Sequence, residues 1–173
     1  LSALPAPTVS IGYLRTLVDP VFFLPTNTTA LWTATGIVTS WTNVTTAGNA
    51  QFYLEDGTGG IAVYVAGGST IRPQAGDSVT VTGPLGHFNS LLELNLTTAN
   101  PAHKVVTNSS GNLLPPGTQQ PFSFTNSPAF GGVGNAIQRY QGAVVTFTNV
   151  YFPEGFIGTN LFRSGFNHTM TNS

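Results

Sequence analysis

The chain has 173 residues, of which 6% are charged and none is Cys, and its formal net charge is -1. Ordinary soluble proteins are roughly a quarter charged, so hydroxyl and amide groups must make up most of the polar surface here. Its five Lys and Arg residues are scattered, which argues against a strong nucleic-acid binder or an anionic-membrane surface. The absence of Cys excludes disulfides, thiolate metal sites and a Cys nucleophile.

This polar but weakly charged surface suits an extracellular or cell-surface protein. Hydroxyls and amides cost less to desolvate than ions, so the surface also tolerates close packing against other subunits. No apolar run reaches the roughly 18 residues that a membrane span needs. The start at Leu1, without a charged and apolar leader, favours a mature, processed chain.

Residues 1–29 are predicted to form an N-terminal arm without a long regular element. Proline interrupts the arm at Pro5, Pro7, Pro20 and Pro25. Within the arm, Ser10–Val18 suits a short helix or strand, and Val21–Leu24 is an apolar run. Because an exposed apolar arm is costly, we expect it to pack on its own domain or on a neighbouring subunit.

Residues 30–107 are predicted to form a half-buried antiparallel β-meander, because apolar and polar residues alternate along them. The expected strands are 30–42, Gln51–Glu55, Ile61–Val65, Ser78–Gly83, Leu91–Thr97 and Lys104–Thr107. Asp56–Gly60 suits a tight hairpin turn, since Asp-Gly and Gly-Gly supply the positive φ angles such turns need. A second turn is expected at His87–Ser90, and a bulge or bend at Gly36.

The rest of the chain is predicted to hold a linker, 108–128, and a second, partial β-unit, 129–173. The linker is rich in Pro, Gly, Ser and Asn. Gln141–Phe152 is strongly strand-like, and Ala136–Tyr140 has a weak helical pattern. The second unit looks unfinished, so we expect either a larger parent protein or completion by a neighbouring chain.

Three segments carry a family resemblance: FYLEDGTGGIAVY at 52–64, GDSVTVTG at 76–83 and FNSLLEL at 88–94. They resemble the second to fifth strands of OB-fold domains of secreted bacterial proteins, which occur beside extracellular nucleases and in large cell-surface proteins. The resemblance implies an all-β, five-stranded, OB-like antiparallel barrel. The helix usual between the third and fourth strands is reduced here to the loop 67–75. We expect the N-terminal apolar segment to plug the barrel end that this helix would cover.

An OB barrel offers a ligand face to oligonucleotides or oligosaccharides, although the fold alone does not establish binding. Five aromatic side chains could stack on sugars or bases or could simply pack in the barrel: Trp32, Trp41, Tyr53, Tyr64 and Phe88. Single-strand binders also need a cationic groove, which this composition does not supply.

Acidic residues near the turns are weak candidates for a metal site. Glu55, Asp56 and Asp77 could bind Ca²⁺, but they match no EF-hand spacing, and a hairpin role for Asp56 is the simpler interpretation. His87, Ser90, Asp77 and Glu93 include hydrolase residue types without a nucleophile elbow. We therefore expect no enzyme activity, no metal and no cofactor.

The leading hypothesis from sequence is a non-catalytic extracellular structural or interaction module, such as a self-assembling filament or surface-layer subunit. Its assembly segments would be Ile11–Phe23 and Val144–Phe152, since strand addition at exposed edges joins chains. The assembly residues expected in the arm are Ile11, Tyr13, Leu14, Val21, Phe22 and Phe23. The alternative is an OB-type binding module of a secreted enzyme that recognises oligosaccharide or single-stranded nucleic acid. Expected partners are other copies of the chain, other domains of a parent protein, or a glycan.

Overall fold

The structure is a computed structural model that describes residues 4–44, 48–88, 91–121, 141–148, 150–151 and 171–172. Strands dominate it, and the one α-helix among the described residues, α1, is a single turn at Ile11–Leu14. The strands of the main sheet are β1 (Leu31–Val38), β2 (Asn43–Val44), β3 (Ala50–Glu55), β4 (Gly60–Ala66), β5 (Ser78–Phe88), β6 (Leu91–Thr97) and β7 (Lys104–Ser109). Two small pairs join β8 (Thr118–Pro121) to β9 (Val145–Thr148) and β10 (Val150–Tyr151) to β11 (Thr171–Asn172).

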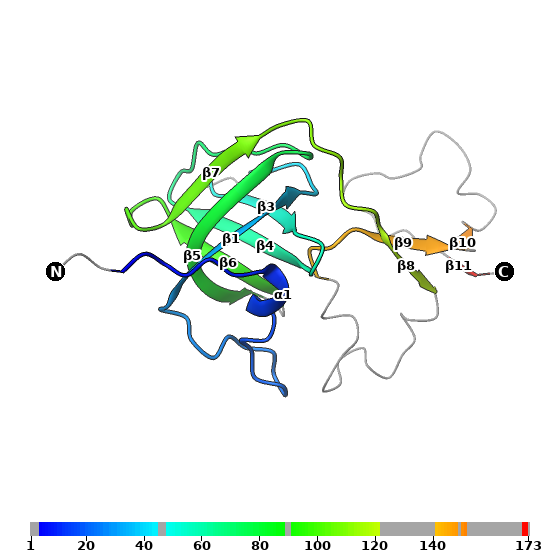
Figure 1. Cartoon of the computed structure of the whole chain (residues 1–173), viewed down its shortest axis with the longest axis horizontal. Helices are drawn as coiled ribbons and strands as arrows, with labels where there is room; N and C mark the ends of the chain where they lie inside the picture. Colours follow the sequence, from blue (N-terminus) through cyan, green and yellow to red (C-terminus); the bar gives the residue numbers. More distant parts are fainter. Residues whose placement is uncertain are drawn as a thin grey trace.

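Five strands close into a barrel (Figure 1). Their order is β1-β3-β4-β6-β5, and β5 pairs back with β1 to complete the ring. Four of these pairings are antiparallel, whereas β4 and β6 run parallel. A parallel pair needs a crossover connection, which β5 and the loop before it provide. The predicted antiparallel meander is therefore wrong for the pairing of β4 with β6. The expected OB-like barrel is confirmed, with β7 added beside β5.

Alternation along the strands builds the barrel interior, as the sequence predicts. Val79 and Val81 of β5 and Leu92, Leu94 and Leu96 of β6 are all buried. They pack with Phe52, Leu54 and Val63 from the β3–β4 hairpin in one apolar core. At Gly36, where β1 passes from β5 to β3, a Cβ atom would lie 2.8 Å from the Glu55 carbonyl oxygen, so only glycine allows this close approach.

The predicted end of the fourth barrel strand at Gly83 is wrong, because β5 continues to Phe88. Gly83 and Pro84 resemble a turn sequence, but both residues pair with β1 in the sheet. A Cβ atom at Gly83 would collide with the Leu96 side chain, so the glycine leaves room for that core residue. Pro84 pairs with Leu31, the first residue of β1, where the missing N–H costs little. The turn expected at 87–90 is therefore wrong for His87 and Phe88, which lie in β5, and residues 89–90 lie outside the described chain.

The N-terminal segment enters the barrel core, which confirms its expected role as a plug. Ile11 and Leu14 are completely buried against the barrel residues. Ser10 caps α1 by accepting a hydrogen bond from the Tyr13 N–H, at 3.2 Å. The Ile11 N–H donates to Asp56 Oδ2 at 2.7 Å and the Gly12 N–H donates to Thr58 Oγ1 at 2.8 Å. The helix turn is thus bonded to the β3–β4 turn that it covers.

Residues 141–144 form a strap across the same end of the barrel. Arg15 Nη1 donates to the Gly60 and Gln141 carbonyls, at 2.9 and 3.4 Å, and the Val144 N–H donates to Glu55 Oε2 at 2.8 Å. The strap backbone lies so close to Gly60 that no Cβ atom would fit there. Burial lowers the pKa of the Arg15 guanidinium to about 10, which still leaves it charged at neutral pH. The predicted helical pattern at 136–140 lies outside the described residues.

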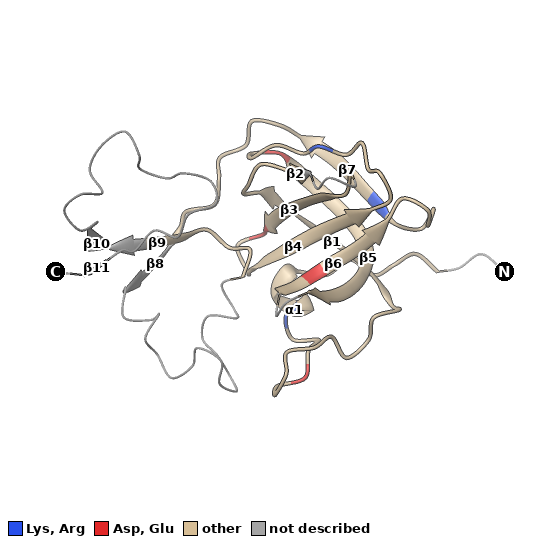
Figure 2. Cartoon of the chain, turned by 180° about the vertical axis from the view of Figure 1, so that it is seen from behind, with Lys and Arg blue, Asp and Glu red and all other residues tan. Residues whose placement is uncertain are grey.

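Charged residues are sparse and dispersed over the described chain (Figure 2). Within the same described ranges, no helix is long and apolar enough to cross a membrane.

Candidate ligand pocket on the outer face of the barrel

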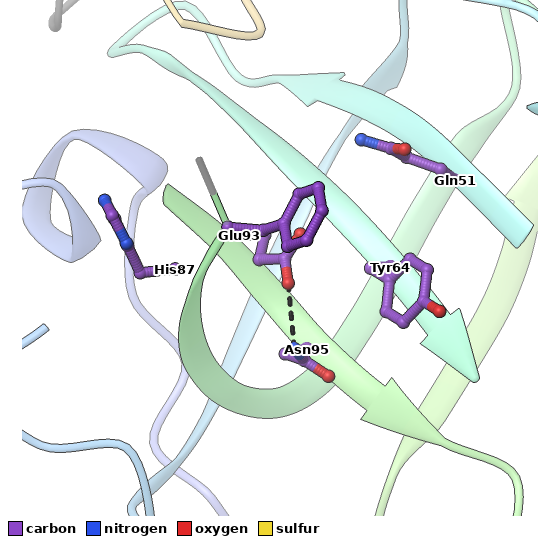
Figure 3. A pocket seen from close by; sticks show the side chains of 6 residues that line it. Gln51, Tyr64, His87, Glu93 and Asn95 are labelled. Atoms are coloured by element: carbon purple, nitrogen blue, oxygen red, sulfur yellow. Dashed lines mark hydrogen bonds between the residues drawn. The ribbon is translucent and has the colours of Figure 1, made fainter. Parts of the chain in front are cut away.

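A pocket of about 300 Å³ opens on the outer face of the barrel. Its lining residues come from four neighbouring strands: Gln51 (β3), Tyr64 (β4), His87 and Phe88 (β5), and Glu93 and Asn95 (β6). Glu93 and Asn95 alternate with the buried leucines of β6, and this alternation turns both side chains outward. The strand register places Tyr64 opposite both Gln51 and Asn95, so these three residues form one row across the sheet (Figure 3).

The Tyr64 ring is held in place by a polar contact beyond the pocket. The Asn49 amide donates to the Tyr64 hydroxyl at 2.6 Å. Asn49 Oδ1 in turn accepts from the Gly67 N–H at 3.1 Å, which ties the amide to the loop after β4. A tyrosine fixed at its hydroxyl loses little freedom when a ligand stacks on its ring.

Glu93 is the acidic residue of the pocket, and only 3% of its surface is exposed. Asn95 Nδ2 donates to Glu93 Oε1 at 2.8 Å, while Oε2 accepts no hydrogen bond from the described residues (Figure 3). Burial raises the pKa of the Glu93 carboxyl group, and the Asn95 amide opposes this by stabilising the charged form. Oε2, which has no donor among the described residues, is the carboxyl oxygen that could accept a hydrogen bond from a ligand.

Phe88 and His87 form the wall of the pocket at the end of β5. Phe88 is 64% exposed and supplies the second aromatic ring of the pocket. His87 Nε2 is buried and has no hydrogen-bond partner among the described residues. Figure 3 shows the imidazole turned away from Glu93, so the two do not form an acid–base pair.

The structure brings together only two of the five aromatic residues predicted to bind ligand, Tyr64 and Phe88. Trp32 packs against the core and makes an edge contact with Tyr13, with ring centroids 6.0 Å apart. Trp41 is 78% exposed, outside the pocket. Tyr53 pairs with Ala62, two residues along β3 from Gln51, so it shares the outer face without lining the pocket.

The three weak metal candidates lie in separate hydrogen-bonding environments. Asp56 accepts from Ile11 N–H and from both the N–H and hydroxyl of Thr58, as a hairpin turn requires. Glu55 holds the strap. Asp77 accepts from the Gln74 N–H at 2.8 Å, and this bond, with one from Ser110, lowers the pKa of the Asp77 carboxyl group. Among the described residues, no three acidic, His or Cys side chains gather as a metal site would require.

The residues predicted to assemble the chain divide into two groups. Ile11 and Leu14 are buried in the core and are therefore not accessible to a partner. The large exposed members are Tyr13 (47%), Val21 (50%) and Phe22 (72%). Phe23 is half-buried and has a positive φ of 58°, an uncommon conformation for a bulky residue.

Sequence reasoning missed Gln51 and Asn95 and dismissed His87 and Glu93 as a chance hydrolase-like set. The signal that could have found them is the strand register. Once β4 and β6 are paired in parallel, Gln51, Tyr64 and Asn95 fall in one row. The predicted meander contained no such pairing, so this row could not be recognised.

No protein-family profile matches the sequence, and no curated protein is significantly similar to it. Among solved structures, the chain is similar to the OB domain of Ta0387 from Thermoplasma acidophilum, with 19% identity and a TM-score of 0.39 over 64% of this chain and 92% of that domain. It is also similar to a chain of a replication protein A heterotrimer bound to single-stranded DNA, with 18% identity and a TM-score of 0.32 over 49% of this chain and 58% of that one. A third similar structure is yeast Stn1 and Ten1, with 16% identity and a TM-score of 0.36 over 60% of this chain and 64% of the matched chain.

Proposed function

We propose that this chain is a non-catalytic binding module that holds an oligosaccharide in the pocket on its outer face. The observation that carries the proposal is the lining of that pocket, in which two aromatic rings lie beside two amides and a carboxyl group. Aromatic rings provide apolar faces for stacking, and amide and carboxyl groups bond to hydroxyls in both directions. Such a set suits a polyhydroxylated ligand.

The same lining argues against nucleic acid as the ligand. None of the six lining residues is Lys or Arg, and Glu93 would face the phosphates with a like charge. Binding of single-stranded nucleic acid draws on a cationic groove as well as on aromatic stacking. Oligosaccharide is therefore favoured over the other ligand class that OB barrels accept. An extracellular or cell-surface location remains part of this proposal, as does the absence of catalysis.

The proposal is tested by comparing two aromatic substitutions on a panel of neutral oligosaccharides and single-stranded oligonucleotides. Tyr64→Ala should weaken glycan binding by about ten-fold or more, the loss typical of a well-packed aromatic contact. Trp41→Ala removes an exposed aromatic ring outside the pocket and is the matched control. Titration by calorimetry measures both. If no glycan binds, or if both variants bind as the wild type does, the pocket is not the binding site.

A second candidate function, self-association, rests on a different observation. The loop Pro20–Leu24 carries three large apolar side chains that are about half exposed or more: Val21, Phe22 and Leu24. Asp19 fixes this loop, because its carboxylate accepts from the N–H groups of Val21, Phe22 and Leu24 at 2.7–3.0 Å. An ordered apolar projection pays little entropy on docking against a second copy of the chain.

Self-association is tested by a substitution at the tip of that loop. Phe22→Ser should shift the sedimentation profile towards monomer, and Leu113→Ser, at a 93% exposed leucine elsewhere, should not. Deleting residues 1–24 is a poorer test, since it also removes the core residues Ile11 and Leu14. A wild-type chain that stays monomeric at high concentration would rule this candidate out.

A further inference from the structure

Glu93 is the one acidic side chain among the six described residues that line the pocket, and none of the six is Lys or Arg. The carboxyl group lies in the middle of the site: its residue pairs with Ala62 of β4 on one side and with Gly86 of β5 on the other. Neither neighbour brings a charged group to the carboxyl group, and the Asn95 side chain covers Gly86, where a Cβ atom would lie 2.6 Å from the Asn95 Cβ atom.

The two oxygens of Glu93 differ in their hydrogen bonds to the described residues. Oε1 already accepts from the Asn95 amide at 2.8 Å, and Oε2 has no donor among the described residues. A sugar hydroxyl can donate to Oε2 and satisfy it. A ligand carboxylate has no proton to donate at neutral pH and brings a second negative charge into a poorly hydrated site.

We propose that the pocket discriminates between glycans by charge, accepting neutral sugar units and rejecting uronates, and that Glu93 is the residue that imposes this choice. The inference rests on the proposed function and narrows it to a ligand class. Two unit charges about 4 Å apart repel by about 1 kcal/mol even in bulk water and by more in a partly buried site. The discrimination should therefore be at least about five-fold in affinity.

The test uses pairs of ligands that differ in charge alone. Oligogalacturonate, oligomannuronate and oligoglucuronate are each compared with their carboxyl-reduced forms, which keep the same linkage but carry a hydroxymethyl group instead of the carboxylate. Affinities are measured at pH 8 and again at higher salt, where a charge-based preference must shrink. The wild type should bind at least one reduced form at least five-fold more tightly than its uronate.

Two variants assign the preference to Glu93. Glu93→Gln keeps the shape and an acceptor oxygen but removes the charge, so the affinity ratio between the neutral and acidic forms should move towards one. Gln51→Lys places a cation in the same lining and should raise the affinity for the uronates, which keeps the test informative if Glu93→Gln does not fold. Circular dichroism and the melting temperature establish folding for each variant.

The outcomes separate this inference from the proposed function. The inference is supported if the wild type prefers the neutral forms and this preference is smaller in both variants. Uronates that bind as well as their reduced forms overturn it while the glycan-binding function stands. A neutral preference that Glu93→Gln leaves unchanged shows that another feature of the pocket imposes it. Failure of the whole panel to bind contradicts the proposed function itself.

Discussion

The closed end of the barrel and its outer face use acidic residues in opposite ways. At the closed end, both Asp56 oxygens accept hydrogen bonds, from Ile11 and Thr58, and Glu55 holds the Val144 N–H. On the outer face, Glu93 is nearly buried yet leaves Oε2 without a donor from the described residues. A carboxylate whose two oxygens are both filled, as in Asp56, serves the fold. Glu55 and Glu93 each leave one oxygen without a donor among the described residues, but of these two only Glu93 lines the pocket, so it is the better candidate for ligand binding.

The largest loss of stability is expected when the N-terminal plug of the closed end loses a core side chain. Leu14→Ala deletes a completely buried side chain, and such truncations cost about 2–5 kcal/mol. Urea unfolding followed by fluorescence measures the loss. Leu113→Ala removes a leucine that is 93% exposed and should change stability by less than about 0.5 kcal/mol. Similar small losses in both variants would mean that the N-terminal segment is not part of the core.

A smaller effect is expected when the link between the plug and the β3–β4 turn is cut. Asp56→Ala leaves the Ile11 N–H without its acceptor, and an unpaired buried donor costs about 1–3 kcal/mol. Asp56→Asn keeps one acceptor oxygen and should lose less. Unfolding midpoints in urea rank the two variants. Equal stability of Asp56→Ala and the wild type would remove the structural role assigned to this carboxylate.

Glu93→Gln should have a still smaller effect, and of opposite sign. Burial raises the folded-state pKa of Glu93, so its contribution to stability is greatest below the unfolded pKa and is lost as pH rises through the folded pKa. Glutamine is neutral throughout this range. The variant should therefore be more stable than the wild type at pH 7.5, and the difference should shrink as the pH falls towards 4.

Thermal melts of wild type and Glu93→Gln at both pH values measure this difference. Asp77→Asn is the matched control, because hydrogen bonds lower the pKa of Asp77 and the expected sign is reversed. A Glu93→Gln variant that is destabilised at pH 7.5 would place Glu93 with the structural carboxylates and weaken the contrast between the two regions.

The sequence predicted most barrel strands because their alternation is local. β6 lies at Leu91–Thr97 as expected, β3 begins one residue earlier than predicted, and β4 is longer than predicted by one residue at each end. The length of β5 was not predictable from its own residues. Gly83 and Pro84 suit a turn by composition, and only the distant residues Leu96 and Leu31 explain why they lie in a strand.

The candidate site was less predictable than the fold, because it depends on pairings between distant strands. Tyr64 and Phe88 were among the expected ligand residues, since aromatic rings are conspicuous in any sequence. Gln51 and Asn95 are ordinary polar residues until the register places them beside Tyr64. The burial of Glu93, which leaves 3% of the residue exposed, likewise has no signal in its own stretch of sequence. Local patterns thus identify strands, while a site across strands requires their order.

The smallest expected effect concerns Asp19, whose two carboxylate oxygens are both occupied, like those of Asp56. Hydrogen bonds from Phe22, Leu24 and Val21 lower the pKa of the Asp19 carboxyl group, with Phe22 the largest cause. Asp19→Ala should loosen the loop without shifting the urea midpoint, because the residue lies outside the core. Chymotrypsin at pH 8 should then cut after Phe22 faster than in the wild type or in Thr28→Ala, a nearby control.

Proteolysis at acidic pH is the second half of the Asp19 test. A lowered pKa means that the stabilising charge is present above the unfolded pKa and is lost as pH falls through the folded value. The difference in cleavage rate between wild type and Asp19→Ala should therefore shrink as the pH is lowered below the unfolded pKa, which a series of digestions with an acid protease measures. If chymotrypsin does not distinguish the two at pH 8, Asp19 does not order the loop. The apolar projection then loses the preorganisation on which self-association depends, while the Glu93 pocket is unaffected.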